Sequence, residues 1–312
     1  MKCPARLDRS LLAIPLAAVL VAFSAGCGGG KSAATTTTTT VLPTNPNSGG
    51  HFKAALVSDI AGFNDNGFNK NQLKGLNRAV KKVGGTAIPL ISHSASDYNP
   101  NFNQAIRQGA KVVVAAGYLL APTMKIYSKK FPNVDFAITD DSYKDAGGGK
   151  NVEGLTYATQ EAGCLVGVLA AKMTQKLGGT KIGAVGGIKI PPVDSYIAGY
   201  RYCAAKAVPG TTTVVQYSNN FDDPNKCQPV AQNEIGQGVK VLFQVAGGGG
   251  RGVLKAADAA KLWGIGVDAD EYNDAKRILT SAVKKTDVGV YDAVTQSADG
   301  MFHGGSDLLL NV

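Results

Sequence analysis

The stretch QGAKVVVAAG, residues 108–117, has a counterpart in QGVKVLFQVAGG, residues 237–248. In each copy a β-rich apolar run follows a helical segment and ends in small residues. The chain therefore contains two similar halves. Further pairs occur in the same order: DYNPN at 97–101 matches FDDPN at 221–225, and FAITDD at 136–141 matches GIGVDAD at 264–270.

Within each half, short β-rich runs alternate with longer helical segments. Residues 68–83 place Leu73, Leu76 and Val80 on one side at a spacing of three to four, as an amphipathic helix requires. Short apolar strands separated by helices are typical of a parallel sheet that is covered on both faces. We therefore predict an α/β protein of two lobes, with first-lobe strands near 52–57, 86–91, 111–115 and 135–139.

The first residues carry the pattern of an export signal. Lys2, Arg6 and Arg9 precede the apolar run 11–23, and small residues follow before Cys27. The pattern resembles a bacterial lipobox, so we predict a lipoprotein signal peptide over residues 1–26 and lipidation of Cys27. An uncleaved anchor with an incidental cysteine is the alternative. Residues 27–50 are rich in Gly, Ser, Thr, Asn and Pro, which favours a flexible tether to the extracytoplasmic face of the cell membrane.

Composition and charge narrow the classes of function. The 312 residues are 44% hydrophobic and 18% charged, which is typical of a folded protein. The formal net charge is +9, but the basic residues are scattered rather than gathered in runs, so we expect a solvated basic surface and no nucleic-acid partner.

Cysteine and histidine give little support to a metal site or a cofactor. Cys164, Cys203 and Cys227 lack metal-ligand spacing, and the chain holds three histidines. We expect Cys164 to pack in a core, and Cys203 and Cys227 are the pair that could form a disulfide in an exported protein. We predict no metal, no cofactor and no histidine-based catalytic triad.

Unusual residues follow equivalent strands in both halves. Because loops at the carboxyl ends of parallel strands meet at one edge of a sheet, these residues are expected around a crevice shared by the lobes. No serine in these loops has a histidine nearby, and the glycine clusters match no phosphate-binding motif. Carboxylates, amides and aromatic rings suit a nucleoside or a sugar. The residues are Asp59, Phe63, Asn64, Asp65, Phe68, Asn69, Asp140, Asp141, Ile190, Pro191, Phe221, residues 246–252 and Asp268.

From residue 52 to about 296 the chain resembles the basic membrane protein (Bmp) family, which comprises lipoprotein substrate-binding components of ABC transporters and includes purine nucleoside receptors. The resemblance rests on SDIAGFNDNGFNKN, FAITDD, IAGYRYC, FDDPNK, VAGGGGRGV, IGVDAD and ILTSAVKK. It implies a type I periplasmic-binding-protein fold of two Rossmann-like lobes that close by a hinge on a ligand. It also implies an ABC permease and ATPase as partners, import of a purine nucleoside, and no enzymatic activity.

The resemblance also assigns roles within the crevice. Phe68 and Phe221 would stack on the base, and Asp140 would hydrogen-bond its edge. Asp268 and Lys284 would reach the ribose, with Lys285 as an alternative to Lys284. Asp59 and Asn69 would complete the first-lobe contacts, and Gly247 and Gly248 would let the backbone approach. Lys70, Gly249 and Arg251 depart from the family pattern.

The expected lobe boundaries are 51–156 with 284–300 for the first lobe and 157–283 with 301–312 for the second. We also expect a family member to continue beyond residue 312 with a strand and a helix. Three alternatives to nucleoside import stay open at this point. They are a receptor for a sugar or other small metabolite, a surface nucleoside hydrolase that uses the aspartates, and a sensory or surface-interaction protein of the same fold.

Overall fold

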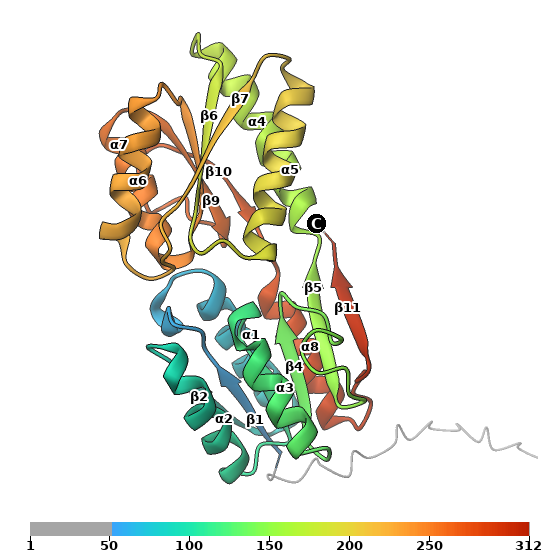
Figure 1. Ribbon diagram of the computed structural model, residues 1–312. Helices are drawn as coiled ribbons and strands as arrows, with labels where there is room; N and C mark the ends of the chain where they lie inside the picture. The colour runs from blue at the N-terminus through green and yellow to red at the C-terminus, as the bar shows by residue number, and fades with distance from the viewer. Residues whose placement is uncertain (1–51, 312) are drawn as a thin grey trace, which may run out of the picture. The chain divides into compact units, whose positions relative to one another are not determined.

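The computed structural model describes residues 52–311 with their side chains (Figure 1). The predicted signal peptide, Cys27 and the tether lie outside the described residues. Within the described part, the first lobe contains a parallel sheet of six strands in the order β11-β5-β4-β3-β1-β2. These strands are β1 (Lys53–Val57), β2 (Thr86–Leu90), β3 (Val112–Ala115), β4 (Asp135–Thr139), β5 (Val152–Tyr157) and β11 (Ser306–Leu310).

Helices cover both faces of this sheet. α2 (Tyr98–Arg107) and α3 (Ala121–Lys130) pack on one face, where Phe102, Tyr127 and Phe136 form part of the core. α1 (Phe68–Val83) and α8 (Thr286–Ala298) pack on the other face. The predicted strands and the predicted helix 68–83 are confirmed, because the sheet buries the apolar strands on both faces and α1 buries its apolar side.

The second lobe repeats the arrangement on five parallel strands in the order β10-β9-β8-β6-β7. α4 and α5 pack on one face of this sheet, and α6 and α7 pack on the other. The strands are β6 (Lys181–Gly186), β7 (Thr212–Tyr217), β8 (Val241–Val245), β9 (Trp263–Asp268) and β10 (Ile278–Val283). The helices are α4 (Thr159–Lys176), α5 (Pro191–Ala207), α6 (Pro224–Gly236) and α7 (Arg251–Ala259).

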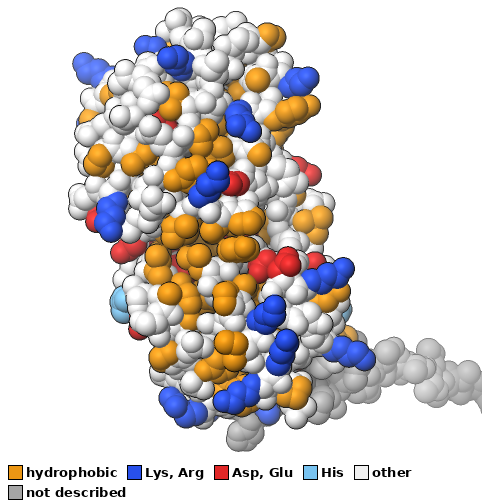
Figure 2. Space-filling model, viewed as in Figure 1, with side chains coloured by type: hydrophobic (Ala, Val, Ile, Leu, Met, Phe, Trp, Pro, Cys, Tyr) orange, Lys and Arg blue, Asp and Glu red, His pale blue; other side chains and the backbone are white. Residues whose placement is uncertain are grey.

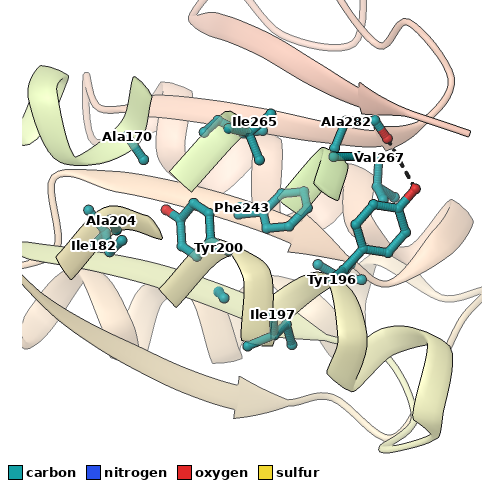
Figure 3. Packing of buried hydrophobic residues seen from close by; sticks show 14 of the residues in the cluster. Ala170, Ile182, Tyr196, Ile197, Tyr200, Ala204, Phe243, Ile265, Val267 and Ala282 are labelled. Atoms are coloured by element: carbon teal, nitrogen blue, oxygen red, sulfur yellow. Dashed lines mark hydrogen bonds between the residues drawn. The ribbon is translucent and has the colours of Figure 1, made fainter. Parts of the chain in front are cut away.

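Aromatic side chains fill the core between α5 and the second sheet (Figure 3). Tyr196 and Tyr200 project from α5 onto Phe243 of β8, with ring centroids 6.0 and 5.1 Å from that of Phe243. The Tyr196 hydroxyl donates a hydrogen bond to the backbone oxygen of Ala282 on β10, at 3.3 Å. This core therefore fixes α5 against the strand that leads into the lobe crossing.

The last strand corrects one of the expected boundaries. Residues 301–312 were assigned to the second lobe, but β11 pairs in parallel with β5, so residues 306–310 belong to the first sheet. The chain crosses between the lobes after β5 and after β10, and α8 and β11 both follow the second crossing. β11 lies at the edge of its sheet, where three of its five residues are exposed, so its pattern is less apolar than that of a central strand.

The cysteines pair differently from the expectation. Cys164 of α4 and Cys203 of α5 form the disulfide, with their Cα atoms 5.0 Å apart, and Cys227 is a buried free thiol. The two helices approach this closely because glycines face backbone across the contact. A Cβ added at Gly163 would lie 2.1 Å from the Tyr196 oxygen. Cys164 is therefore half-exposed on a helix pair rather than an ordinary core residue.

Candidate functional site

Loops at the carboxyl ends of both sheets surround one cavity. Its volume is about 60 Å³, which is below the usual range for small-molecule sites. Eight of the nine predicted ligand-binding residues line it, and Gly248 does not. The lining residues are Asp59, Ala61, Asp65, Phe68, Asn69, Gly117, Tyr118, Leu119, Asp140, Ile190, Pro192, Val193, Tyr196, Phe221, Val245, Gly247, Asp268 and Lys284.

A buried lysine joins carboxylates from the two lobes. The Lys284 Nζ atom lies 2.7 Å from Asp140 Oδ2 of the first lobe and 3.3 Å from Asp268 Oδ1 of the second. Burial alone would lower the pKa of Lys284, but the negative charges of Asp140 and Asp268 raise it above the ordinary value. The lysine therefore stays protonated and links the lobes beside the cavity.

Asp140 and Asp268 occupy equivalent places in the repeat. Asp140 follows β4 and Asp268 ends β9, and both have left-handed backbone conformations, with φ of +65° and +62°. Such a conformation is uncommon outside glycine, although Asp tolerates it better than most residues. Burial raises the pKa of Asp268, and the charge of Lys284 opposes that rise. The shared geometry turns both carboxylates toward Lys284.

The polar corner of the first lobe is built around Asp59. Its Oδ1 atom accepts hydrogen bonds from the Asn69 side chain at 2.7 Å and the Ala61 amide at 2.9 Å. Burial raises the pKa of Asp59 to about 7. No hydrogen bond to the second carboxylate oxygen, Oδ2, is found among residues 52–311, so this atom is available to a ligand in the cavity.

Asp65 holds the start of α1. Its carboxylate accepts hydrogen bonds from the backbone amides of Gly67, Asn69 and Lys70, which would otherwise lack partners at a helix N-terminus. Asp65 therefore shapes this loop, and it also lines the cavity. Lys70 is exposed and donates to the Asn66 side chain, so it does not line the cavity.

Two phenylalanines come to the cavity from opposite lobes. Phe68 is the first residue of α1, and the Lys284 Nζ atom lies 4.7 Å from its ring centroid. Phe221 precedes α6, and its ring packs on Gly187, where an added Cβ would lie 2.3 Å from the ring. Phe68 is thus held by Lys284 of the crossing segment, and Phe221 is held by Gly187 of its own lobe.

The glycine-rich loop contributes unequally to the cavity. Gly247 lines it with φ of +54°, whereas an added Cβ at Gly248 would lie 3.2 Å from the Asp65 Cα atom of the other lobe. Gly248 therefore permits close approach of the lobes rather than forming the cavity wall. Arg251 donates to the Gly248 oxygen at 3.3 Å and to the Asn64 oxygen at 3.5 Å, so this departure from the family pattern also faces the first lobe.

Some lining residues were missed by the sequence reasoning. Gly117, Tyr118 and Leu119 follow β3 in the first lobe, and the repeat offered a signal for them, because AAGYLL there aligns with VAGGGG in the second lobe. Tyr196 gave no such signal, since it reads as a core residue of α5. Lys285 is exposed and does not line the cavity, whereas Lys284 does. Within residues 52–311 no cluster of His, Cys, Asp and Glu is suited to hold a metal.

Comparison with known families decides what kind of protein carries this cavity. The family model described as "ABC transporter substrate-binding protein PnrA-like" (Bmp) matches residues 52–312. The chain belongs to this family. The family is one of non-catalytic binding proteins, and a substrate-binding component of an ABC transporter implies a small ligand and transporter subunits as partners.

Similar proteins place the match in context. The nucleoside-binding protein BmpA of an ABC transporter from Lactococcus lactis is 35% identical over 83% of this chain and 79% of its own length. An uncharacterized lipoprotein of Pyrococcus abyssi is 30% identical over 93% of this chain and 72% of its own. A solute-binding protein of an Aeropyrum pernix ABC transporter system superposes with a TM-score of 0.75 at 27% identity, over 83% of this chain and 74% of that one.

These matches confirm the type I periplasmic-binding-protein fold of this Bmp-family chain. Related proteins are named as lipoproteins or basic membrane proteins. Among residues 52–311, no helix has the length and apolar content needed to cross a membrane.

Proposed function

We propose that this Bmp-family protein binds a purine nucleoside between its two lobes and delivers it to an ABC permease for import. The observation that carries the proposal is the meeting of Phe68, Phe221, Asp268 and Lys284 in one cavity. The relative from Lactococcus lactis named as nucleoside-binding supports the same ligand class.

Each of these residues can contact a particular part of a nucleoside. Phe68 and Phe221 offer aromatic faces to a base, and stacking of this kind contributes about 1–3 kcal/mol per base. Asp268 accepts hydrogen bonds from ribose hydroxyls, and the ammonium of Lys284 donates to ribose oxygens. Asp140, with Asp59 and Asn69, contacts the edge of the base. Gly247 leaves room for the ligand beside the backbone.

The partners follow from the transporter class. The protein acts with an ABC permease and an ATPase, and a lipid on Cys27 holds it at the extracytoplasmic face of the membrane. Residues 28–51 separate that cysteine from the first described residue, Phe52. Mass spectrometry of the mature protein tests the anchor, since acylation adds a defined mass at Cys27.

Calorimetric titration of the purified protein with inosine, guanosine, adenosine and ribose tests the ligand class. We expect saturable binding of at least one purine nucleoside and much weaker binding of ribose, because the two aromatic faces need a base. Binding of ribose with no response to any nucleoside would contradict the proposal and favour a sugar receptor. Recovery of the nucleoside intact after incubation separates a receptor from a hydrolase.

Asp268→Asn tests the ribose contact. The amide keeps the shape of the side chain but loses the charge, so we expect nucleoside affinity to fall roughly 10- to 150-fold, the range that 1.5–3 kcal/mol of charge-assisted hydrogen bonding implies. For the Asp268→Asn variant, replacing the nucleoside with its 2′,3′-dideoxy analogue, which lacks the ribose hydroxyls, should lower the affinity little further. Asp270→Asn, an exposed carboxyl two residues away, serves as the matched control. Equal affinities of the Asp268 variant and the wild type would remove Asp268 from the proposed contacts.

A further inference from the structure

Basic side chains gather at the end of the first lobe that lies opposite the ligand cavity. The cavity lies at the carboxyl ends of the parallel strands, so strand starts and helix ends share the other end of the lobe. Figure 2 shows several Lys and Arg side chains over the lower end of the view, where Figure 1 places this lobe. We call these residues the basic end: Lys53, Lys81, Lys82, Arg107, Lys111, Lys129, Lys130 and Lys150.

Little acidic charge offsets the basic end. Lys53 is half-exposed and the other seven are exposed, and none of the eight forms an ion pair with another residue in 52–311. Asp135 and Asp299 lie at the same end. The Asp135 carboxylate accepts a hydrogen bond from the Ser297 hydroxyl at 2.7 Å and is partly buried. The exposed charge of this end is therefore strongly positive.

The second lobe has a similarly charged end, so charge by itself does not choose between the two. Lys176, Lys181 and Lys261 are exposed at its strand starts and helix ends. The repeat is close enough that Lys53 donates to the Gln108 oxygen and Lys181 donates to the Gln237 oxygen, both at 3.0 Å. A difference between the ends must come from something outside the folded lobes.

The position of the N-terminal segment supplies that difference. The described chain begins at Phe52, directly before Lys53 and β1, and so enters the first lobe at the basic end. Residues 28–51 reach at most roughly 85 Å when extended. Lipidation at Cys27 would therefore keep the basic end near the bilayer and raise its effective concentration there. The second lobe joins the chain only beyond β5 and gains no such proximity.

We propose that the basic end of the first lobe docks on anionic phospholipid headgroups of the membrane that anchors the chain. Basic clusters of four to eight residues beside an anchor are the usual feature of such docking. The strand carboxyl ends would then point away from the bilayer, which leaves the cavity mouth open to solvent for ligand capture. The inference rests on the anchor at Cys27 and not on the identity of the ligand.

Lysine acetylation by a water-soluble reagent, quantified at each residue by mass spectrometry, tests the docking. The acylated protein is placed in vesicles of phosphatidylcholine alone or of phosphatidylcholine with phosphatidylglycerol, without nucleoside. We expect Lys111, Lys129 and Lys130 to react several-fold more slowly on the anionic vesicles. Lys176, Lys181 and Lys261 should react equally on both. The protection should disappear in about 0.5 M salt, where the Debye length is only about 4 Å.

Two triple variants, one at each end, provide the control. Lys111→Glu with Lys129→Glu and Lys130→Glu should abolish the remaining protection of Lys81, Lys82 and Lys150. Lys176→Glu with Lys181→Glu and Lys261→Glu makes the same change in net charge and should preserve that protection. Equal protection of both ends would indicate general attraction to polyanions and overturn the proposal. Absence of a difference between the two kinds of vesicle would also overturn it.

Discussion

The two lobes share a scaffold and differ in the loops that they bring to the cavity. Asp140 and Asp268 end equivalent strands with the same left-handed backbone. The first lobe adds a carboxylate and an amide, Asp59 and Asn69, whereas Val193 and Val245 of the second lobe make its wall more apolar. The shared strand ends thus fix where a ligand binds, whereas the different loops determine which part of the ligand each lobe contacts.

The lobes also differ in whether a disulfide joins the two helices on one face of the sheet. The second lobe carries the Cys164–Cys203 disulfide between α4 and α5. The equivalent helix pair of the first lobe, α8 and α1, has no disulfide, although it has a similar close approach. An added Cβ at Gly75 would lie 2.3 Å from the Asp287 oxygen. Lys284, in the crossing segment, is the side chain on which the two equivalent aspartates converge.

Replacing Lys284 should have the largest effect, because it leaves both aspartates buried without a cation. We expect Lys284→Met to lower the free energy of unfolding by about 3–5 kcal/mol at pH 7 and to abolish ligand binding. Urea unfolding and calorimetric titration measure the two losses. The stability loss should shrink as the pH falls, because burial raises the pKa of Asp268 and its protonation relieves the repulsion between the carboxylates.

Lys285→Met is the matched control for this experiment. Lys285 is exposed beside Lys284, so its replacement should change the free energy of unfolding by no more than about 0.5 kcal/mol. If both variants unfolded at the same urea concentration, Lys284 would not stabilise the buried Asp140 and Asp268 carboxylates in the folded protein.

Removing the disulfide should affect the second lobe by a somewhat smaller amount. Its cysteines are 39 residues apart, so the double variant Cys164→Ala with Cys203→Ala should lose about 2–4 kcal/mol of stability. A reducing agent should lower the melting temperature of the wild type and of Cys227→Ala, and should leave the double variant unchanged. A response of the double variant to reduction would contradict the assigned pairing.

The sequence predicted the scaffold well because the central strands are apolar on both faces and each helix buries one apolar face. It also identified many of the residues that line the cavity, since the repeat aligned Asp140 with Asp268, but the first-lobe counterpart of the glycine loop was missed. The disulfide was predicted wrongly because it depends on the distance between α4 and α5. That distance is set by Gly163, Gly167 and Gly199, whose packing partners are far away in the sequence. β11 was placed in the wrong lobe because strand pairing, rather than order along the chain, assigns an edge strand to its sheet.

The smallest expected effect is the pH dependence of the free energy of unfolding that comes from Asp59 in the first-lobe polar corner. Burial raises the pKa of Asp59 to about 7, so the folded state holds a proton that the unfolded chain releases near pH 4. Stability from this group is therefore greatest at low pH and is lost as the pH rises to about 7. Between pH 6 and 7 the loss should be about 1 kcal/mol. Asp59→Asn, whose amide cannot ionise, should reduce the fall by that amount in urea unfolding at the two pH values. An equal fall in both proteins would mean that Asp59 is already ionised at pH 6 and that the corner is better solvated than its 7% exposure suggests.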